Sequence, residues 1–187
     1  MIFSHMFSGC EELVSLDLSN FDTRSASDMY EMFLNCISLK SINLSNFNTS
    51  NVLFFNGMFS GCKELVSLDL SNFDTRSAYE MDEMFYECNK LVYLNLPNFN
   101  LSNIGYMRNI FVNCTNLEYI NLYNFQERSY SLFDNIFEGV PDNLIYCIND
   151  EEKAPLIISE LKNKKGNCTV NDCTNNWKSN QIKINEK

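Results

Sequence analysis

The feature that most constrains this chain is an internal repeat of 26 residues. Its simplest mark is a column of cysteines that recur at this spacing: Cys10, Cys36, Cys62, Cys88 and Cys114. Residues 8–33 and 60–85 differ at only four of 26 positions, which indicates duplication of a block of two repeats. A unit this short cannot enclose a core alone, so the repeats must stack into an array.

Each repeat is predicted to contain a short strand followed by a short helix. Leu16 and Leu18 alternate with polar residues, the period of two that is typical of a strand with one buried face. The apolar residues that follow have the three- and four-residue spacing of one helix face: Ala26, Met29, Met32, Phe33 and Cys36. A residue suited to N-capping precedes that segment in each repeat: Ser25, Asn51, Ser77, Asn103 and Ser129. We therefore expect an α/β solenoid of strand–turn–short helix units.

This repeat unit resembles a known family. The pattern L-x-x-L-x-L resembles the leucine-rich repeat, and the fuller unit L-x-x-L-[DN]-L-S-N-F-[DN]-T…M-x-x-M-F-x-x-C is similar to the repeat of BspA-like surface proteins of bacteria and parasitic protists. The resemblance covers about residues 1–140 and implies a right-handed array of the leucine-rich-repeat type, with five full repeats and partial ends. The position that usually holds a buried asparagine is here Phe21, Phe47, Phe73, Phe99 and Phe125. We expect a spine of phenyl rings in place of the usual amide ladder.

Residues 141–187 leave the repeat and are predicted to form a C-terminal cap with a short helix. Residues 154–164 place apolar side chains on one side of that helix: Leu156, Ile157 and Leu161. Pro155 falls in its first turn, where proline is tolerated. The last coil of an array needs such a cover for its apolar face. At the other end, Phe3 fits the column of Met29, so the sequence enters the repeat part-way, as a fragment of a longer protein would.

The cysteines fall into two groups. The five in the repeat column lie among Met and Phe positions, so we expect buried thiols; ladder disulfides and metal binding are the weaker alternatives, because a column offers one ligand per repeat. Cys147, Cys168 and Cys173 lie outside that column. They are too sparse for a zinc site, and in a secreted protein we expect one disulfide among them, with the pair left open.

Charge and hydropathy exclude several classes of function. The formal net charge is −10, and all of the acidic excess falls within residues 1–140. A concentrated basic face is needed to bind phosphates, so nucleic acid is not an expected partner. No run of 18 apolar residues predicts a membrane span, and the first ten residues lack the pattern of a secretory signal.

Catalytic machinery is not apparent in the sequence. His5 is the single histidine, so any histidine-dependent centre would have to use it. Asp17 and Asp69 are two repeats apart, about 10 Å at one strand spacing per repeat, which is too far for a general acid and base without other support. We expect no enzyme, no cofactor and no metal site. Calcium held by the Asp/Asn column is the alternative to a solvated face.

The remaining candidate is the outward-facing side of the strands, the concave face of such a solenoid. The predicted partner-binding residues on it are Asp17, Asn43, Asp69, Asn95, Asn121, Tyr93, Tyr119 and Tyr123. Three of these are tyrosines of the later repeats, which offer the rigid amphipathic area that is enriched at binding hot spots. Tyrosine is also favoured in strands for its own packing, so these three side chains alternatively shield backbone or contact the cap.

The sequence thus favours a non-enzymatic protein-binding or adhesion module. The BspA-like resemblance implies a location at the cell surface or outside the cell, with a protein or glycoprotein of a host surface or extracellular matrix as partner. An intracellular leucine-rich-repeat scaffold is the alternative, favoured by the thiols and by the lack of a signal in these residues.

Overall fold

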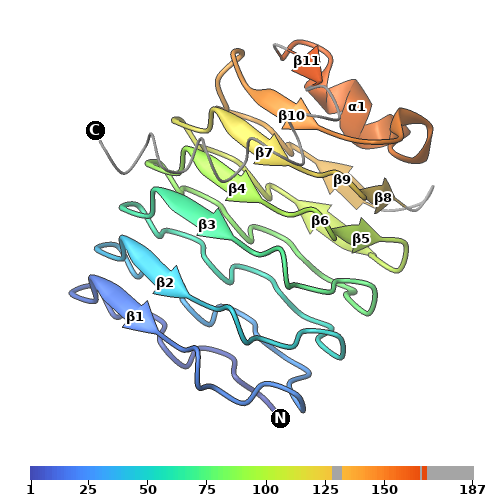
Figure 1. The fold of residues 1–187 in the computed structure, drawn as a ribbon. Helices are drawn as coiled ribbons and strands as arrows, with labels where there is room; N and C mark the ends of the chain where they lie inside the picture. The colour runs from blue at the N-terminus through green and yellow to red at the C-terminus, as the bar shows by residue number, and fades with distance from the viewer. Residues whose placement is uncertain (128–131, 165, 168–187) are drawn as a thin grey trace.

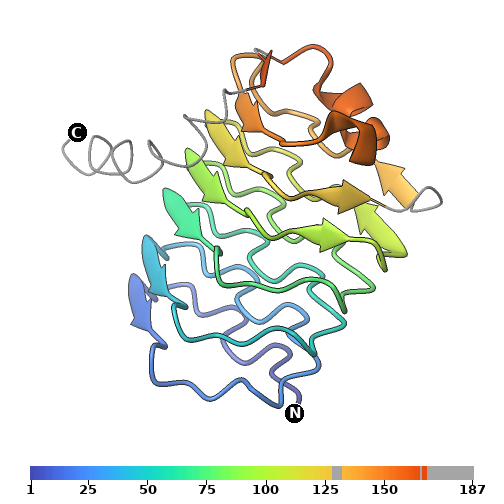
Figure 2. The same ribbon diagram turned by 45° about the vertical axis from the view of Figure 1, so that its right-hand side comes forward.

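The computed structural model describes residues 1–127, 132–164 and 166–167. Each repeat forms one coil of a solenoid, and the coils stack in sequence order from one end of the molecule to the other (Figures 1 and 2). We number them coils 1 to 5: residues 8–33, 34–59, 60–85, 86–111 and 112–137. The molecule is therefore a parallel β-solenoid with little helix.

The main ladder is a row of parallel strands along the stack, with one strand from each of coils 1 to 5 and two from the residues beyond them, and it is interrupted between coils 2 and 3. Its strands are β1 (Ser15–Asp17), β2 (Ser41–Asn43), β3 (Ser67–Asp69), β4 (Tyr93–Asn95), β7 (Tyr119–Asn121), β10 (Ile145–Cys147) and β11 (Gly166–Asn167). β1 pairs with β2, and β11-β10-β7-β4-β3 form a five-stranded sheet. Ser15 pairs with Ser41 and Tyr93 with Tyr119, so the predicted 26-residue register is confirmed.

Two shorter ladders lie on other sides of the coil. One joins single bridges at Ile2, Asp28, Phe54, Glu80 and Tyr106 and widens into the pair β6 (Tyr106–Arg108) and β9 (Leu132–Asp134). The other pairs β5 (Asn100–Leu101) with β8 (Gln126–Glu127). Figure 1 shows β5, β6, β8 and β9 apart from the main ladder. Each coil is thus tied to its neighbours on more than one side.

The predicted short helix of each repeat is wrong, because this half of the coil is a run of turns. Two residues in the run have positive φ, Glu31 at 52° and Asn35 at 57°, which a right-handed helix does not accommodate. Alternate amides bond to the next coil rather than along a helix; the Phe33 amide donates to the Met58 carbonyl at 2.9 Å. The three- and four-residue spacing of the apolar residues reflects turns that direct side chains inward.

The burial predicted for this segment is nevertheless confirmed. All of its apolar residues are buried: Ala26, Met29, Met32, Phe33 and Cys36. The predicted N-caps have no helix to cap, and Ser129 lies outside the described residues. Three of them donate instead to carbonyls of the preceding coil: Ser77 to Ser50 at 2.6 Å, Asn103 to Arg76 at 2.6 Å and Asn51 to Arg24 at 3.5 Å.

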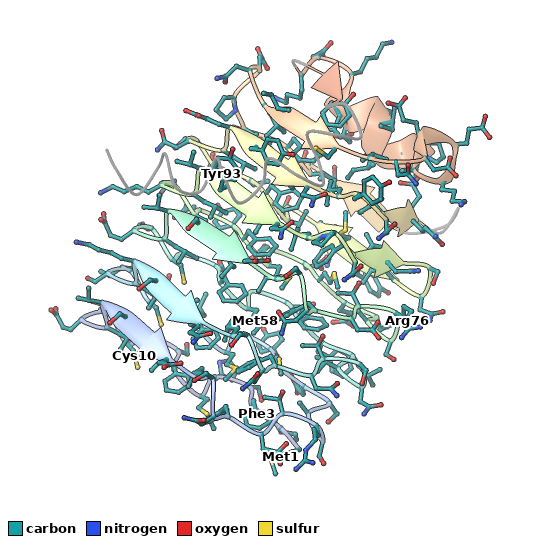
Figure 3. All side chains as sticks on the ribbon, in the orientation of Figure 1. Met1, Phe3, Cys10, Met58, Arg76 and Tyr93 are labelled. Atoms are coloured by element: carbon teal, nitrogen blue, oxygen red, sulfur yellow. The ribbon has the colours of Figure 1, made fainter. Side chains whose placement is uncertain are left out.

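Stacked phenyl rings fill the interior of the solenoid. The predicted spine is present, with Phe47 centred 6.4 Å from both Phe21 and Phe73. A second stack runs through every coil, with centroids 5.2 to 5.8 Å apart: Phe7, Phe33, Phe59, Phe85, Phe111 and Phe137. Figure 3 shows side chains filling the interior of the stack, with Phe3 and Met58 labelled among them. The stacks give each coil an aromatic contact with both neighbours.

Polar side chains tie the coils at the corner that follows the main strand. The buried Thr49 hydroxyl accepts from the Asp74 amide at 2.8 Å and donates to the Asp74 carbonyl at 3.0 Å. The Asn72 amide group donates to the carbonyls of Leu44 and Phe47 at 3.0 and 2.9 Å. An amide ladder therefore accompanies the phenyl spine, whereas the sequence predicted that the spine would replace it.

A single α-helix of the described residues closes the C-terminal end. α1 (Pro155–Leu161) follows the 3-10 turn η1 (Glu151–Lys153), and it buries Ile157 and Leu161 while Leu156 stays exposed. Glu127 accepts from the Leu156 and Ile157 amides at 2.5 and 3.1 Å, so a residue of the array caps the helix. The main ladder continues past residue 140 through β10. No helix within the described ranges is long and apolar enough to cross a bilayer.

Candidate functional site

The outward face of the main ladder is open over the first coils and closed over the later ones. Ser15, Asp17, Ser41 and Asn43 are exposed on β1 and β2. Every residue of β4 and β7 is buried. The predicted site residues therefore share one face, as expected, but their environments differ along it.

A shallow hollow lies on the open part of this face. Its volume is about 290 Å³, and it is lined by β1 and β2 alone: Ser15, Leu16, Asp17, Ser41, Ile42 and Asn43. The Ser15 and Ser41 hydroxyls make no hydrogen bond with any residue that the structure describes. These hydroxyls are therefore available to a partner.

The Asp/Asn column has a structural task at the end of each strand. The Asp17 carboxylate accepts from the Ser19 amide at 3.0 Å, and Asn43 and Asp69 accept in the same way at 3.1 and 3.0 Å. This local bond stabilises the turn after the strand. The Ser19 amide is also the main reason why the pKa of Asp17 is lowered. Each acceptor keeps further lone pairs for a partner.

In the later coils the same column becomes an internal ladder. Asn121 donates to the Asn95 side-chain oxygen at 2.8 Å, and Asn95 donates to the Asp69 carboxylate at 2.8 Å. Asn95 and Asn121 are both 5% exposed. The column therefore presents free polar groups on coils 1 to 3 and internal hydrogen bonds beyond them.

The tyrosines also lie below the surface. Tyr93 and Tyr119 stack with centroids 5.1 Å apart, and they are only 7% and 6% exposed. The Tyr119 hydroxyl lies 2.7 Å from the Cys147 sulfur, and Tyr123 is half-buried. The alternative prediction, that these rings shield structure, agrees with this burial. Partner contact by Tyr93, Tyr119 and Tyr123 stays a prediction.

The thiol column is buried with one exception. Cys36, Cys62, Cys88 and Cys114 are buried, and each sulfur donates to the carbonyl of the phenylalanine 29 residues earlier in the chain, at 3.1 to 3.3 Å. Burial raises the pKa of Cys36 to about 11 and that of Cys114 to about 12. Cys10 alone of the column is exposed. Cys147 is disulfide-bonded, and the other two cysteines of its predicted group lie outside the described residues.

The groups considered for chemistry do not gather into a centre in the described part of the chain. His5 lies 3.3 Å from Glu31, with its ring against the edge of Tyr30, at the surface of the first coils. Among residues 1–127, 132–164 and 166–167, no three His, Cys, Asp or Glu side chains are grouped to hold a metal ion.

A second hollow, missed by the sequence reasoning, lies at the corner of coils 3 to 5. It measures about 450 Å³ and its polar lining includes Asp74, Arg76, Asn98, Asn124 and Gln126. The sequence does show an Asn that recurs every 26 residues after each strand, including Asn98 and Asn124. That recurrence predicts a column of polar side chains, but it does not indicate that the surface beside them is concave.

Comparisons with known proteins place the chain in a family. No curated protein and no solved structure gave a match. The match that was found does not name BspA-like proteins, so that resemblance remains a prediction. A family model described as "Mycoplasma protein of unknown function, DUF285" matches residues 1–125, about two thirds of the chain, and the chain belongs to that family.

Proposed function

We propose that the chain is a non-enzymatic recognition module that binds a protein or glycoprotein through the open strand face of coils 1 to 3. The observation that carries the proposal is the row of exposed polar side chains on β1, β2 and β3, including Asp17, Asn43 and Asp69. Parallel strands repeat these groups at about 4.8 Å intervals. Such a lattice suits an extended partner held at many points.

The proposed location is the cell surface or the extracellular space, as in BspA-like proteins. The disulfide at Cys147 supports it, because disulfides persist in oxidising compartments. The four buried thiols do not argue against it, because burial raises their pKa and removes them from exchange. An extracellular matrix or host-surface glycoprotein is the proposed partner.

The test compares two variants that differ only in where two arginines are placed. The first carries Ser15→Arg and Ser41→Arg, which fill the hollow between β1 and β2. The matched control carries Ser25→Arg and Ser102→Arg, at exposed serines away from the main strands. Immobilised fibronectin, laminin and a mucin serve as probes, each with and without its glycans.

We expect the wild-type chain to bind at least one probe and the strand-face variant to bind it about tenfold more weakly or worse, a hot-spot effect. The control should bind as the wild type does. Equal weakening in both variants would point to charge rather than to the strand face. Undiminished binding by the strand-face variant, or no binding to any probe, would overturn the proposal.

A further inference from the structure

The end face of coil 1 exposes several apolar side chains. Ile2, Met6 and Val14 are 69%, 47% and 51% exposed. Leu13 and Leu16 are half-buried, whereas their equivalents Leu65 and Leu68 are 0% and 3% exposed. Figure 3 shows Met1, Phe3 and Cys10 at this end of the stack. A contiguous apolar face of this kind marks an interaction surface.

This face also has backbone carbonyls that accept no hydrogen bond from the described residues. In coils 1 and 2, the carbonyls of Asp28, Tyr30, Met32 and Leu34 each accept an amide from the preceding turn of chain, at 2.7 to 2.9 Å. The equivalent carbonyls one repeat earlier belong to Ile2, Ser4, Met6 and Ser8, and they accept no hydrogen bond from the described residues. The face is therefore a row of acceptors that is complementary to a row of amides.

The molecule itself contains a covered copy of this face. Coil 3 repeats the sequence of coil 1 except at four positions, and coil 2 lies on it. In the equivalent interface the Phe33 amide donates to the Met58 carbonyl at 2.9 Å, and the Phe33 ring stacks on Phe59 at 5.4 Å. The Thr49 hydroxyl adds its pair of bonds to Asp74. The open end has the same groups in the same places: Met6, Phe7 and Asp22 stand where the covered copy has Met58, Phe59 and Asp74.

We propose that the exposed face of coil 1 is a docking surface for a further coil of this same repeat, in line with the array and running in the same direction as coil 1. Direction matters because, in this row of turns, each amide donates to a carbonyl of the following coil, as Phe33 does to Met58 and Asn35 to Ser60. A coil of that polarity brings amides to the open carbonyls of Ile2, Ser4, Met6 and Ser8.

A second copy of the chain does not meet these requirements. Face to face, two such ends would not supply the row of amides that meets the equivalent carbonyls inside the array, and unmet buried acceptors are costly. Glu11 and Glu12, both exposed at this end, would also approach their own counterparts. Coil 3 has Lys63 in place of Glu11, and there Lys63 pairs with Glu87 of the following coil.

The test adds a coil of the repeat to this face and measures how fast the Cys10 thiol is alkylated. A chain of residues 1–59 followed by residues 8–187 contains residues 8–59 twice, and it reproduces the natural junction because Ser8 stands where Ser60 does. The first copy carries Cys10→Ser, so only the covered Cys10 is followed. We expect iodoacetamide to alkylate it at least about a hundredfold more slowly than in the unextended chain.

The control is the same extended chain with Leu39→Ser, Leu44→Ser and Phe47→Ser in its first copy, and its Cys10 should react as fast as in the unextended chain. Should the extended chain lose cooperative unfolding, residues 34–59 followed by residues 8–187 provide a one-coil version. A Cys10 that stays reactive in both versions would overturn the proposal. So would a dimer of the unextended chain, seen by light scattering, in which Cys10 is protected.

Discussion

Coil 1 and coil 3 have almost the same sequence but different environments. Cys10 is exposed and Phe21 is half-buried, while Cys62 is 0% and Phe73 1% exposed. The four substitutions between the two coils do not include any of these positions. The difference comes from the neighbour, since coil 3 is covered on both sides and coil 1 on one. Burial, thiol reactivity and stability are therefore properties of a position in the stack.

The largest expected effect is on thiol reactivity. Burial raises the pKa of Cys62, which donates to the Phe33 carbonyl, so both the ionisation and the access that alkylation needs are removed. In the native protein at pH 8 we expect iodoacetamide to modify Cys62 on the order of a thousandfold more slowly than Cys10. Mass spectrometry of the cysteine peptides over time measures the ratio.

The same reaction in 6 M guanidinium chloride is the control, and there Cys10 and Cys62 should react at equal rates. A native Cys62 that reacts as fast as Cys10 would break the comparison, because it would mean that stacking does not protect coil 3.

The second effect concerns the ring stack. Phe59 is 0% exposed between Phe33 and Phe85, whereas Phe7 is half-buried and has a ring partner only in Phe33. Phe59→Ala should lower the free energy of unfolding by about 3–5 kcal/mol, and Phe7→Ala by roughly half as much, because less surface is lost. Denaturant unfolding followed by circular dichroism measures both. Equal losses would show that the end coil is as tightly packed as the interior.

The third effect should have the same sign in both coils. Glu31 of coil 1 and Glu83 of coil 3 have φ of 52° and 60°, a conformation that Asn adopts more readily than Glu. Glu83→Asn should raise the free energy of unfolding by about 0.5–1 kcal/mol. Glu31→Asn should gain less, because Glu31 also pairs with His5. Thermal unfolding tests both; a loss of stability in Glu83→Asn would contradict the backbone argument.

The smallest effect distinguishes two surface ion pairs. Asp22 pairs with Arg24 and Asp74 with Arg76, and bonds to the arginine lower the pKa of both carboxyls, that of Asp22 to about 2. A folded pKa below the unfolded value of 3.8 gives stability that is present above pH 3.8 and lost as the pH falls toward 2. Arg24→Gln should return the pKa of Asp22 toward 3.8 and lower stability at pH 7 only slightly, because solvent screens this exposed pair.

Arg76→Gln is the matched variant in coil 3. Asp74 is 28% exposed, against 61% for Asp22, and its backbone is bonded to Thr49, so we expect Arg76→Gln to affect stability more than Arg24→Gln. Carboxyl NMR titration between pH 1.5 and 6 gives both pKa values. An Asp22 pKa near 3.8 in the wild-type chain would remove the basis of this comparison.

The sequence predicted the stacking and the buried columns because both follow from strict periodicity. It failed at the helix, because inward-facing turns at Met29, Met32 and Cys36 imitate a helical face. The contrary signal was the recurrence of Gly or Asn at positions such as Gly61 and Asn35, which favour positive φ. For the site, periodicity placed the residues on one face, but it carries no information on which coils are covered, so the burial of the tyrosines was not predictable.

Along the turns of each coil, amides alternately bond within the coil and to the next coil. This alternation limits which insertions and deletions the chain can accommodate. Removal or insertion of one residue would exchange the two sets of amides along the rest of that coil and turn its inward side chains outward. Gain or loss of whole repeats leaves every set in place. Length in this protein can therefore change in steps of whole coils without disturbing the packing, whereas a small insertion or deletion would destabilise the coil that carries it. The near-identity of residues 8–33 and 60–85 is the trace that such a step would leave.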